Sequence, residues 1–373
     1  MNRSDQSRVA LVGLGNAGFT LHLPALAGMS GVEVVGACDP DTARRSRAES
    51  TFRVPVFDDF DVMLERGRPN LIVIGTPPDS HADYCLRSLA AGANVICEKP
   101  FVSSLDEADR VIAAADAAGL HVALNHEFRE MPIFRAIRDA ARAKGDVVFA
   151  QAWQLMDLPP WAEPGWRGQM LKRTLYEAGV HLVDFLMALF GEKPVAVTAT
   201  TSTCGVREGD TDAVALATLE FSRGRLAQIV QNRLCKGETQ YFEVRAETPG
   251  ESLRASFGGR ARLTAGLHRS TRPHFRLDYG VAGLAWAEVG NQRRFLARNP
   301  ADPGMIATRF VFEKTIAAFR DGGEPPASAR VGRDVLEVIA ACYHSASTGR
   351  RIELGAAASL ALSDLRLAAG PAT

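Results

Sequence analysis

The stretch RVALVGLGNAG, residues 8–18, is the most informative part of the sequence for fold class. It begins as a short apolar run rich in valine and leucine and ends in glycines, which is typical of a strand buried on both faces of a parallel sheet. Four later runs have the same character: VEVVGACD (32–39), LIVIGT (71–76), NVICE (94–98) and HVALN (121–125). Helical patterns separate them, at 41–52, 80–91 and 104–119. The alternation predicts an α/β fold with a doubly wound parallel sheet and helices on both faces.

Gly13, Gly15 and Gly18 end the first strand as a G-x-G-x-x-G motif, with Asn16 and Ala17 between the last two glycines. Glycines let the backbone turn sharply and approach a pyrophosphate, which rests on the N-terminus of the following helix. The preceding strand favours a dinucleotide site over a purely structural tight turn.

Asp39 ends the second strand, 21 residues after Gly18, a spacing that suits a carboxylate bound to the adenosine ribose hydroxyls. Such a carboxylate repels a 2′-phosphate, so the sequence favours NAD. Arg44 and Arg45 follow closely and would hold a phosphate if they turned inward, which keeps NADP open; otherwise they face water.

A stiff turn, Thr76-Pro77-Pro78, follows the strand at 71–76. Because ligands bind beyond the carboxyl ends of parallel strands, this turn is expected to shape a wall beneath the nicotinamide riboside. Ser80 is expected to cap the next helix. His81 in its first turn has two interpretations, a surface histidine or part of the cofactor site.

Glu98-Lys99-Pro100 ends the fifth strand at the same edge. Unpaired charges are costly inside a sheet but are acceptable at a rim where cofactor and substrate meet. Lys99 would face a substrate hydroxyl or carbonyl and stabilise its developing charge. Glu98 would hold either the lysine or the nicotinamide ribose. The alternative is a loop in which both charges face solvent.

The pattern RTLYEAGVHLVDFLMALFG (173–191) predicts an apolar helix that ends at Gly191. Its polar side chains Glu177, His181 and Asp184 fall at i, i+4 and i+7 and share one face. Buried polar groups need partners. Histidine titrates near neutral pH and suits proton transfer, with a carboxylate fixing its tautomer; a structural His–Asp pair is the alternative.

The whole-chain numbers exclude several classes of protein. The 373 residues include 43 Lys+Arg and 43 Asp+Glu, so the formal net charge is zero. The chain therefore lacks the excess of positive charge that is typical of proteins that bind nucleic acid or an anionic membrane. The six cysteines form no CxxC pair and no ligand cluster has metal spacing, so we expect reduced thiols, no metal and a cytoplasmic protein. The N-terminus lacks an apolar signal core.

Together these stretches resemble the Gfo/Idh/MocA oxidoreductases, named for glucose–fructose oxidoreductase, inositol dehydrogenase and a rhizopine catabolism protein. The segments that carry the resemblance are GLGNAG, GTPPDSH, CEKP, LNHEFR, EAGVHLVD and, near the end, DVLEVIAACYHSASTGRRIEL. The resemblance implies an NAD(P)-binding Rossmann domain at 1–125 and an α/β domain with an open, mostly antiparallel sheet at 126–373. It also implies a terminal helix that packs back toward the first domain.

The resemblance further implies that Lys99 and His181 are the catalytic pair. Many dehydrogenase members have an aspartate four residues before the histidine, where this chain has Glu177. Glutamate is one methylene longer, so Asp184 is a rival for the third role. Five further side chains are implied to line the nicotinamide pocket: Asn125, His126, Arg129, Trp166 and Arg167.

The second half carries its own strand signals. A hairpin is predicted within 212–234, turning at Ser222-Arg223-Gly224-Arg225, with strands at 241–247, 252–257 and 274–279 and a helix at 305–321. Residues 280–304 are left unassigned. The resemblance implies a homodimer or homotetramer formed through this sheet.

Three functions are consistent with these residues. The first is an NAD-dependent dehydrogenase that transfers a hydride to or from a carbinol of a sugar, cyclitol or related polyol. The second is an enzyme that keeps its nucleotide bound and uses a transient oxidation to cleave a glycoside or exchange two sugars. The third is a dinucleotide-sensing regulator without chemistry, for which the Lys99 and His181 pair has no evident use.

Overall fold

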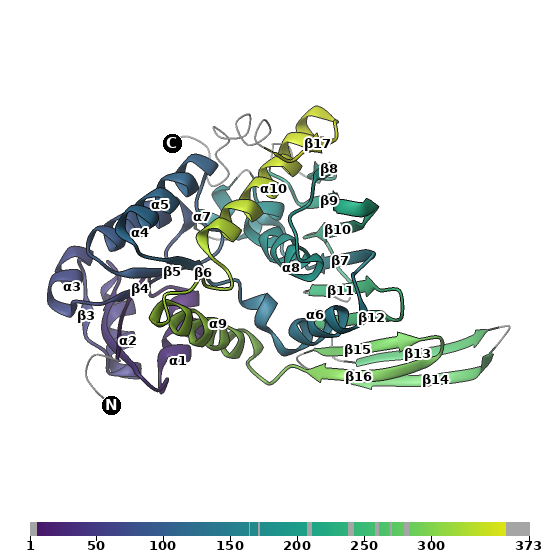
Figure 1. Ribbon diagram of the computed structural model, residues 1–373, viewed down its shortest axis with the longest axis horizontal. Coiled ribbons are helices and arrows are strands. Elements are labelled where there is room, and N and C mark those ends of the chain that lie inside the picture. Colours follow the sequence, from purple (N-terminus) through teal and green to yellow (C-terminus); the bar gives the residue numbers. More distant parts are fainter. Residues whose placement is uncertain are drawn as a thin grey trace.

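The computed structural model describes residues 6–163, 165–170, 172–206, 211–237, 242–257, 261–268, 271–279 and 283–355. The described chain forms a six-stranded sheet, a nine-stranded sheet and a separate two-stranded sheet. Figure 1 shows the six-stranded sheet on the left and the nine-stranded sheet on the right, with α6 (Pro132–Lys144) and α8 (Val180–Phe190) between them.

The first sheet is entirely parallel, in the order β3-β2-β1-β4-β5-β6. Its strands are β1 (Ser7–Val12), β2 (Val32–Cys38), β3 (Val56–Phe57), β4 (Leu71–Ile74), β5 (Asn94–Cys97) and β6 (Val122–Leu124). This confirms the predicted doubly wound sheet. Its central strands are buried on both faces, as β4 shows with four buried residues in succession, so the carboxyl edge is where polar side chains gather.

Helices cover both faces of this sheet, as predicted from the alternating pattern. They are α1 (Leu23–Leu26), α2 (Thr42–Phe52), α3 (Phe60–Gly67), α4 (His81–Ala90) and α5 (Leu105–Ala118). The hydroxyl of Ser104 accepts the Glu107 N–H at the start of α5, which ends at Gly119. Ser80 occupies the predicted N-cap position of α4, but its hydroxyl makes no cap hydrogen bond and contacts the Thr76 hydroxyl and the Pro77 carbonyl instead.

The second sheet is mixed and mostly antiparallel, in the order β16-β15-β12-β11-β7-β10-β9-β8-β17. Its strands are β7 (Phe149–Leu155), β8 (Ala196–Ser202), β9 (Val214–Glu220), β10 (Leu226–Asn232), β11 (Phe242–Glu247), β12 (Ser252–Phe257), β15 (Leu284–Val289), β16 (Gln292–Arg298) and β17 (Ile352–Glu353). Within this second sheet, β7–β10 is the only parallel pair among the described strands. The predicted hairpin is β9–β10, and the unassigned 280–304 stretch contains β15 and β16.

The two-stranded sheet pairs β13 (Ala261–His268) with β14 (Thr271–Tyr279). The strand predicted at 274–279 lies within β14. The helix predicted at 305–321 is α9 (Pro303–Arg320). None of the helices in the described ranges combines the length and hydropathy that a membrane span requires.

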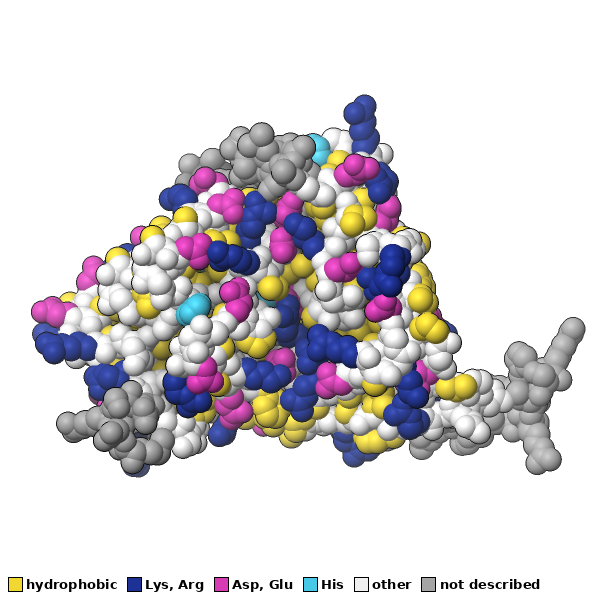
Figure 2. All heavy atoms as spheres, viewed as in Figure 1, with side chains coloured by type: hydrophobic (Ala, Val, Ile, Leu, Met, Phe, Trp, Pro, Cys, Tyr) yellow, Lys and Arg dark blue, Asp and Glu magenta, His cyan; other side chains and the backbone are white. Residues whose placement is uncertain are grey.

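The last helix, α10 (Ala329–Thr348), links the two halves of the molecule (Figure 1). Its Arg330 and Arg333 pair with Asp116 and Asp109 of α5, each with a 2.8 Å contact, while its C-terminal half packs on β8 and leads into β17. The ion pairs thus join α10 to α5, which packs on the first sheet. Basic and acidic side chains are interspersed over the face in Figure 2.

Candidate active site

The glycine loop after β1 combines close backbone packing with one open position. At Gly13 φ is +94°, and a Cβ there would come within 2.6 Å of the Gly75 backbone. A Cβ on Gly18 would overlap the carbonyl oxygen of Gly13, whereas Gly15 has nothing within 4 Å of its Cβ position. Gly13 and Gly18 therefore hold the strand, turn and helix together. Gly15 leaves the open space that a close approach by a dinucleotide pyrophosphate needs.

Asp39 lies beside this loop at the end of β2. Its Oδ2 accepts the Leu14 N–H at 2.8 Å and its Oδ1 accepts the Asp41 N–H at 2.9 Å, and the side chain is almost completely buried. The Arg44 guanidinium lies 3.5 Å from Oδ2. Arg45 instead donates to the carbonyls of Asp39 and Pro40, so of these two arginines Arg44 is the one that contacts the Asp39 carboxylate.

His81 is completely buried, so the interpretation as a surface histidine is wrong. Its Nδ1 lies 3.0 and 2.9 Å from the carbonyls of Pro100 and Phe101, and its Nε2 lies 2.8 Å from the Thr76 carbonyl. Burial lowers the pKa of His81. The ring therefore connects the turn after β4, with Pro77 and Pro78, to the loop after β5.

Glu98 organises the rim of the sheet from a buried position. Its Oε1 lies 2.7 Å from His22 Nε2 and accepts from Asn125 Nδ2 at 2.7 Å, while Oε2 accepts the Lys99 backbone N–H. Burial raises its pKa, but His22, Lys99 and Asn125 outweigh this effect and lower it to about 2. Glu98 holds Lys99 through the backbone; the described contacts show no bond between the carboxylate and the lysine ammonium.

His22 is a site residue that the sequence analysis missed. It ends the short π-helical segment Gly18–His22, directly after the glycine loop, and lies in contact with Glu98 across 76 residues of chain. The only available sequence signal was an apolar segment, FTLHLPAL, that contains one histidine. Nothing in that spacing identifies a partner so far away.

Lys99 reaches from β5 into the second domain. Its Nζ donates to the backbone carbonyl of Glu177 at 3.2 Å and lies 3.6 Å from the Glu177 carboxylate. The lysine side chain is 14% exposed. The Lys99 ammonium thus lies against η6 (Thr174–Gly179), the π-helical segment before α8.

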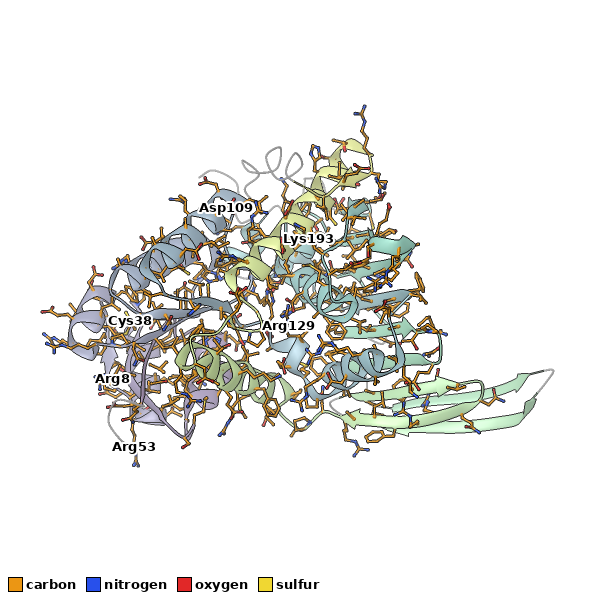
Figure 3. The ribbon with its side chains drawn as sticks, in the orientation of Figure 1. Arg8, Cys38, Arg53, Asp109, Arg129 and Lys193 are labelled. Carbon is orange, nitrogen blue, oxygen red and sulfur yellow. The ribbon has the colours of Figure 1, made fainter. Side chains whose placement is uncertain are left out.

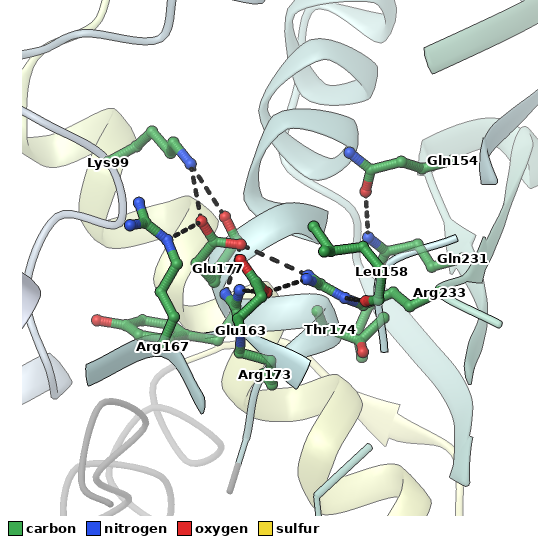
Figure 4. A network of polar contacts seen from close by, with 12 residues as sticks. Lys99, Gln154, Leu158, Glu163, Arg167, Arg173, Thr174, Glu177, Gln231 and Arg233 are labelled. Atoms are coloured by element: carbon green, nitrogen blue, oxygen red, sulfur yellow. Dashed lines mark hydrogen bonds and ion pairs between the residues drawn. The ribbon is translucent and has the colours of Figure 1, made fainter. Parts of the chain in front are cut away.

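Glu177 is surrounded by cations (Figure 4). Its carboxylate lies 2.6 Å from Arg173 Nη1, 3.2 Å from Arg167 Nε and 3.6 Å from Arg233 Nη1. Burial raises its pKa, but Lys99 and the arginines outweigh burial and hold it well below its usual range. Glu163 bridges Arg173 and Arg233. The surrounding cations therefore favour the ionised form of Glu177.

His181 is buried in the first turns of α8. Its ring stacks on Phe128 with 4.1 Å between centroids, and its Nδ1 has no hydrogen-bond partner among the described residues. Burial lowers its pKa well below the usual value, and the charge of Lys99 lowers it further. His181 is thus a neutral imidazole within electrostatic range of Lys99 and Glu177.

Asp184 contacts Arg129, unlike Glu177, which contacts Lys99, and His181, which stacks on Phe128. Arg129 binds it with two hydrogen bonds, of which the Nε–Oδ2 distance is 2.9 Å, and His126 Nε2 lies 3.6 Å from Oδ1. No hydrogen bond joins Asp184 to His181 in the described part of the chain. Glu177 lies at Lys99 and Asp184 lies at Arg129, so the two rivals for the third role occupy separate surroundings.

Several buried polar atoms between β6 and α8 have no hydrogen-bond partner in the described structure. They are Asn125 Oδ1, both ring nitrogens of His126 and Glu127 Oε2. Burial lowers the pKa of His126 to about 4 and raises that of Glu127 to about 8. Such orphaned groups are uncommon and fit a polar ligand bound beside Glu98 and Lys99.

Trp166 and Arg167 begin α7 (Trp166–Gln169). The Arg167 guanidinium carbon lies 4.4 Å from the Trp166 ring centroid, and its Nε contacts Glu177. Arg167 thus lies beside the Lys99–Glu177 contact, and Trp166 packs against it. No group of three or more potential metal ligands occurs within the residues described.

Comparisons with known proteins agree with this geometry. Residues 7–126 match the model of an oxidoreductase family with an NAD-binding Rossmann fold, and residues 134–249 match that of the GFO/IDH/MocA C-terminal domain. The chain is 27% identical to D-apiose dehydrogenase of Paraburkholderia graminis over 343 residues, which are 89% of this chain and 86% of that protein.

Two further likenesses have similar extent. The chain is 27% identical to 1,5-anhydro-D-fructose reductase of Ensifer adhaerens, over 76% of this chain and 79% of that protein. An oxidoreductase from Agrobacterium radiobacter, solved in complex with NAD⁺, L-tartaric acid and magnesium, superposes with a TM-score of 0.78. That match covers 93% of this chain and 98% of the other at 17% identity, so it shows the fold alone.

Proposed function

The chain belongs to the Gfo/Idh/MocA family of NAD(P)-dependent oxidoreductases, and we propose that it transfers a hydride to or from a carbinol carbon of a sugar or related polyol. Lys99 and His181 act on the oxygen of that carbon. The sugar-derived substrates in the names of two relatives support this choice of substrate class. When bound, the nicotinamide ring accepts or supplies the hydride.

The residues of the first domain fit the cofactor. The open position at Gly15 suits the pyrophosphate, and the buried carboxylate of Asp39 suits the ribose hydroxyls. The unpartnered Asn125 Oδ1 and His126 nitrogens suit the polar atoms of the nicotinamide end. We propose NAD as the preferred cofactor because Asp39 stands where a 2′-phosphate would be.

His181 is proposed as the group that takes or returns the hydroxyl proton. A neutral imidazole with an unpartnered Nδ1 is able to accept a proton. Because burial disfavours the imidazolium, the proton is held only while a nearby charge compensates it. Glu177 supplies that charge, since its electrostatic effect opposes the lowering of the His181 pKa.

Lys99 is proposed to donate a hydrogen bond to the same oxygen. An ammonium group has three donors, and the Glu177 backbone carbonyl accepts one of them. The remaining donors are available to an alkoxide, whose charge a buried cation stabilises strongly. Glu177 acts as a positioning residue, because it holds the ammonium without accepting the substrate's proton.

One observation carries the proposal. The only described side-chain contact of the Lys99 ammonium is with Glu177, four residues before His181 on a continuous helical segment. This contact supports the proposal that the cation of the first domain and the neutral base of the second act on one substrate oxygen.

The test is a panel of aldoses, uronic acids, glycosides and inositols assayed with NAD and with NADP, followed by Lys99→Met and His181→Gln on the best substrate. Each change is expected to lower kcat/KM by about a hundred-fold or more. Lys144→Met, at an exposed lysine that ends α6, is the matched control and keeps full activity. Wild-type rates in either site variant would end the proposal.

We also propose that the chain forms a homo-oligomer through the outer face of the second sheet. Leu216 of β9 is 47% exposed and Leu226 of β10 is 39% exposed, on the face opposite the buried residues of these strands. Antiparallel sheets can be covered on one face by another subunit. Sedimentation of the wild type and of Leu216→Lys tests this, since the variant is expected to shift to a smaller species.

A further inference from the structure

One cavity of the described structure has neither the glycine loop nor Lys99 among its lining residues. It measures about 440 Å³ and is formed where η4 (Glu127–Glu130), α6, α8, α9 and α10 meet. It shares only Arg129 with the predicted active-site residues. Arg129 and Lys193 lie between the two sheets in Figure 3, and Figure 2 shows lysine and arginine side chains gathered in the middle of the same face.

The walls of this cavity carry more positive than negative charge. Five cationic side chains line it, and three acidic ones do. One of the acids, Glu192, is already engaged by Arg225 at 2.6 Å and by Ser222. Another, Asp334, pairs with Lys193 at 2.9 Å. Clefts with one predominant sign of charge concentrate ligands of the opposite sign.

Three of the cations are left with capacity to bind. Arg138 is only 8% exposed, yet its Nε has no hydrogen-bond partner among the described residues. Arg138 lies 3.6 Å from the Glu130 carboxylate and 3.6 Å from that of Asp139, and Lys314 also pairs with Glu130. Arg142 is exposed at the cavity wall, and no ion pair of it is found in the described part of the chain. A buried guanidinium with an unused donor is costly unless a ligand completes it.

We propose that this cavity binds a small organic anion through its carboxylate or phosphate groups. Guanidinium groups bind both kinds of oxyanion with paired hydrogen bonds, and the volume is within the range of small-molecule sites. Arg138 supplies buried positive charge in the cavity wall, while Arg142 and Lys314 supply charge from exposed positions.

The anion site connects to the active site through Arg129. The same guanidinium that lines the cavity binds Asp184, while Phe128, one residue earlier, stacks on His181. An anion that draws on Arg129 therefore competes with Asp184 and displaces the short helix η4. This part of the inference depends on the proposed function, whereas anion binding does not.

Calorimetric titration of the full chain tests the binding. The probes are citrate for the carboxylate class and inorganic pyrophosphate for the phosphate class, and NAD is kept saturating so that pyrophosphate cannot occupy the glycine loop. We expect saturable binding of at least one probe. The double variant Arg142→Ala, Lys314→Ala should weaken it about ten-fold or more, with its melting temperature in the absence of probe monitored as the check on folding.

Arg66→Ala, an exposed arginine in the last turn of α3, is the matched control and should bind as the wild type does. The variant Arg138→Gln provides a second test and should also weaken binding. Absence of saturable binding in the wild type, or equal affinities in the wild type and the double variant, would overturn the proposal. A change in turnover of the wild type at saturating probe, lost in the double variant, would establish the connection through Arg129.

Discussion

Lys99 and Glu177 contact each other across the boundary between the two sheets. The ammonium of the first domain's rim lies 3.2 Å from the backbone carbonyl and 3.6 Å from the carboxylate of a residue in the second domain. The same carboxylate is bound by Arg173 and Arg167. The place of the lysine therefore depends on residues of both domains.

Replacing Glu177 by aspartate should lower kcat by about ten-fold or more, with KM changed less. The shorter side chain cannot hold Lys99 and Arg173 at once. Steady-state kinetics on the best substrate measure the effect, with Glu65→Gln at an exposed site as the control. A rise in KM with kcat unchanged would instead assign Glu177 to substrate binding.

Gly15 and Gly18 should respond oppositely to alanine. Gly15→Ala places its Cβ in open space, so the melting temperature should stay within a few degrees while NAD affinity falls about ten-fold or more. Gly18→Ala overlaps the Gly13 carbonyl and should destabilise the fold. Thermal unfolding with and without NAD separates the two outcomes. Unchanged NAD affinity in Gly15→Ala would contradict the assigned pyrophosphate position.

Asp39→Ala should shift the cofactor preference toward NADP. The change removes the carboxylate that repels a 2′-phosphate and frees Arg44, whose Nη1 lies 3.5 Å from it. The ratio of kcat/KM for NAD to that for NADP should fall about ten-fold or more. Asp58→Ala, an exposed residue of the same domain, leaves the ratio unchanged.

Arg129→Leu should destabilise the protein by about 3–5 kcal/mol, because it leaves the buried Asp184 carboxylate without its bidentate partner. The double variant Arg129→Leu, Asp184→Asn should recover part of that loss, since no charge is then left unpaired. Chemical denaturation of both variants measures the difference. Equal stabilities would show that the pair contributes nothing through its charge.

Glu127→Gln should change how stability depends on pH. Burial raises the pKa of Glu127 to about 8, so the folded chain keeps this proton over a range in which the unfolded chain has lost it. The stability that the proton contributes is complete below about pH 4.5 and is lost as pH rises through 8. The variant lacks this loss, so its stability relative to wild type should increase between pH 5 and pH 8, by at most about 1.4 kcal/mol per pH unit.

Denaturation curves of both proteins at pH 5, 6.5 and 8 provide the measurement. The difference between the two curves at each pH removes the contributions of groups that titrate alike in both proteins. A difference that does not vary with pH would contradict a protonated Glu127.

The strands and helices of the first domain could be predicted because each is marked by residues close together in the sequence. The apolar runs, the glycine turn and the cap at Ser104 each depend on neighbours within a few residues. In the second sheet, β16 was missed because it is an edge strand with Phe295 63% exposed, so it lacks the alternation that marks a half-buried strand.

The prediction that Glu177, His181 and Asp184 share one helix face assumed a regular α-helix, and the structure differs. The i, i+4, i+7 pattern assumes α-helical geometry, but Glu177 lies in the π-helical segment Thr174–Gly179, where the hydrogen bonds run from i to i+5. Glu177 therefore contacts Lys99 while Asp184 contacts Arg129. The contact of His22 with Glu98 was also beyond prediction, because nothing local links two residues so distant in sequence.

The return of α10 has a consequence for building chimeras in this family. A graft of residues 1–125 alone would cut the ion pairs of Asp109 and Asp116 with Arg333 and Arg330. It would also remove the backbone bridge between Ala123 of β6 and Ser328. A chimera that exchanges cofactor specificity between relatives should therefore have two crossover points. One lies after β6, and the other lies before α10, so that α10 is transferred together with the first domain.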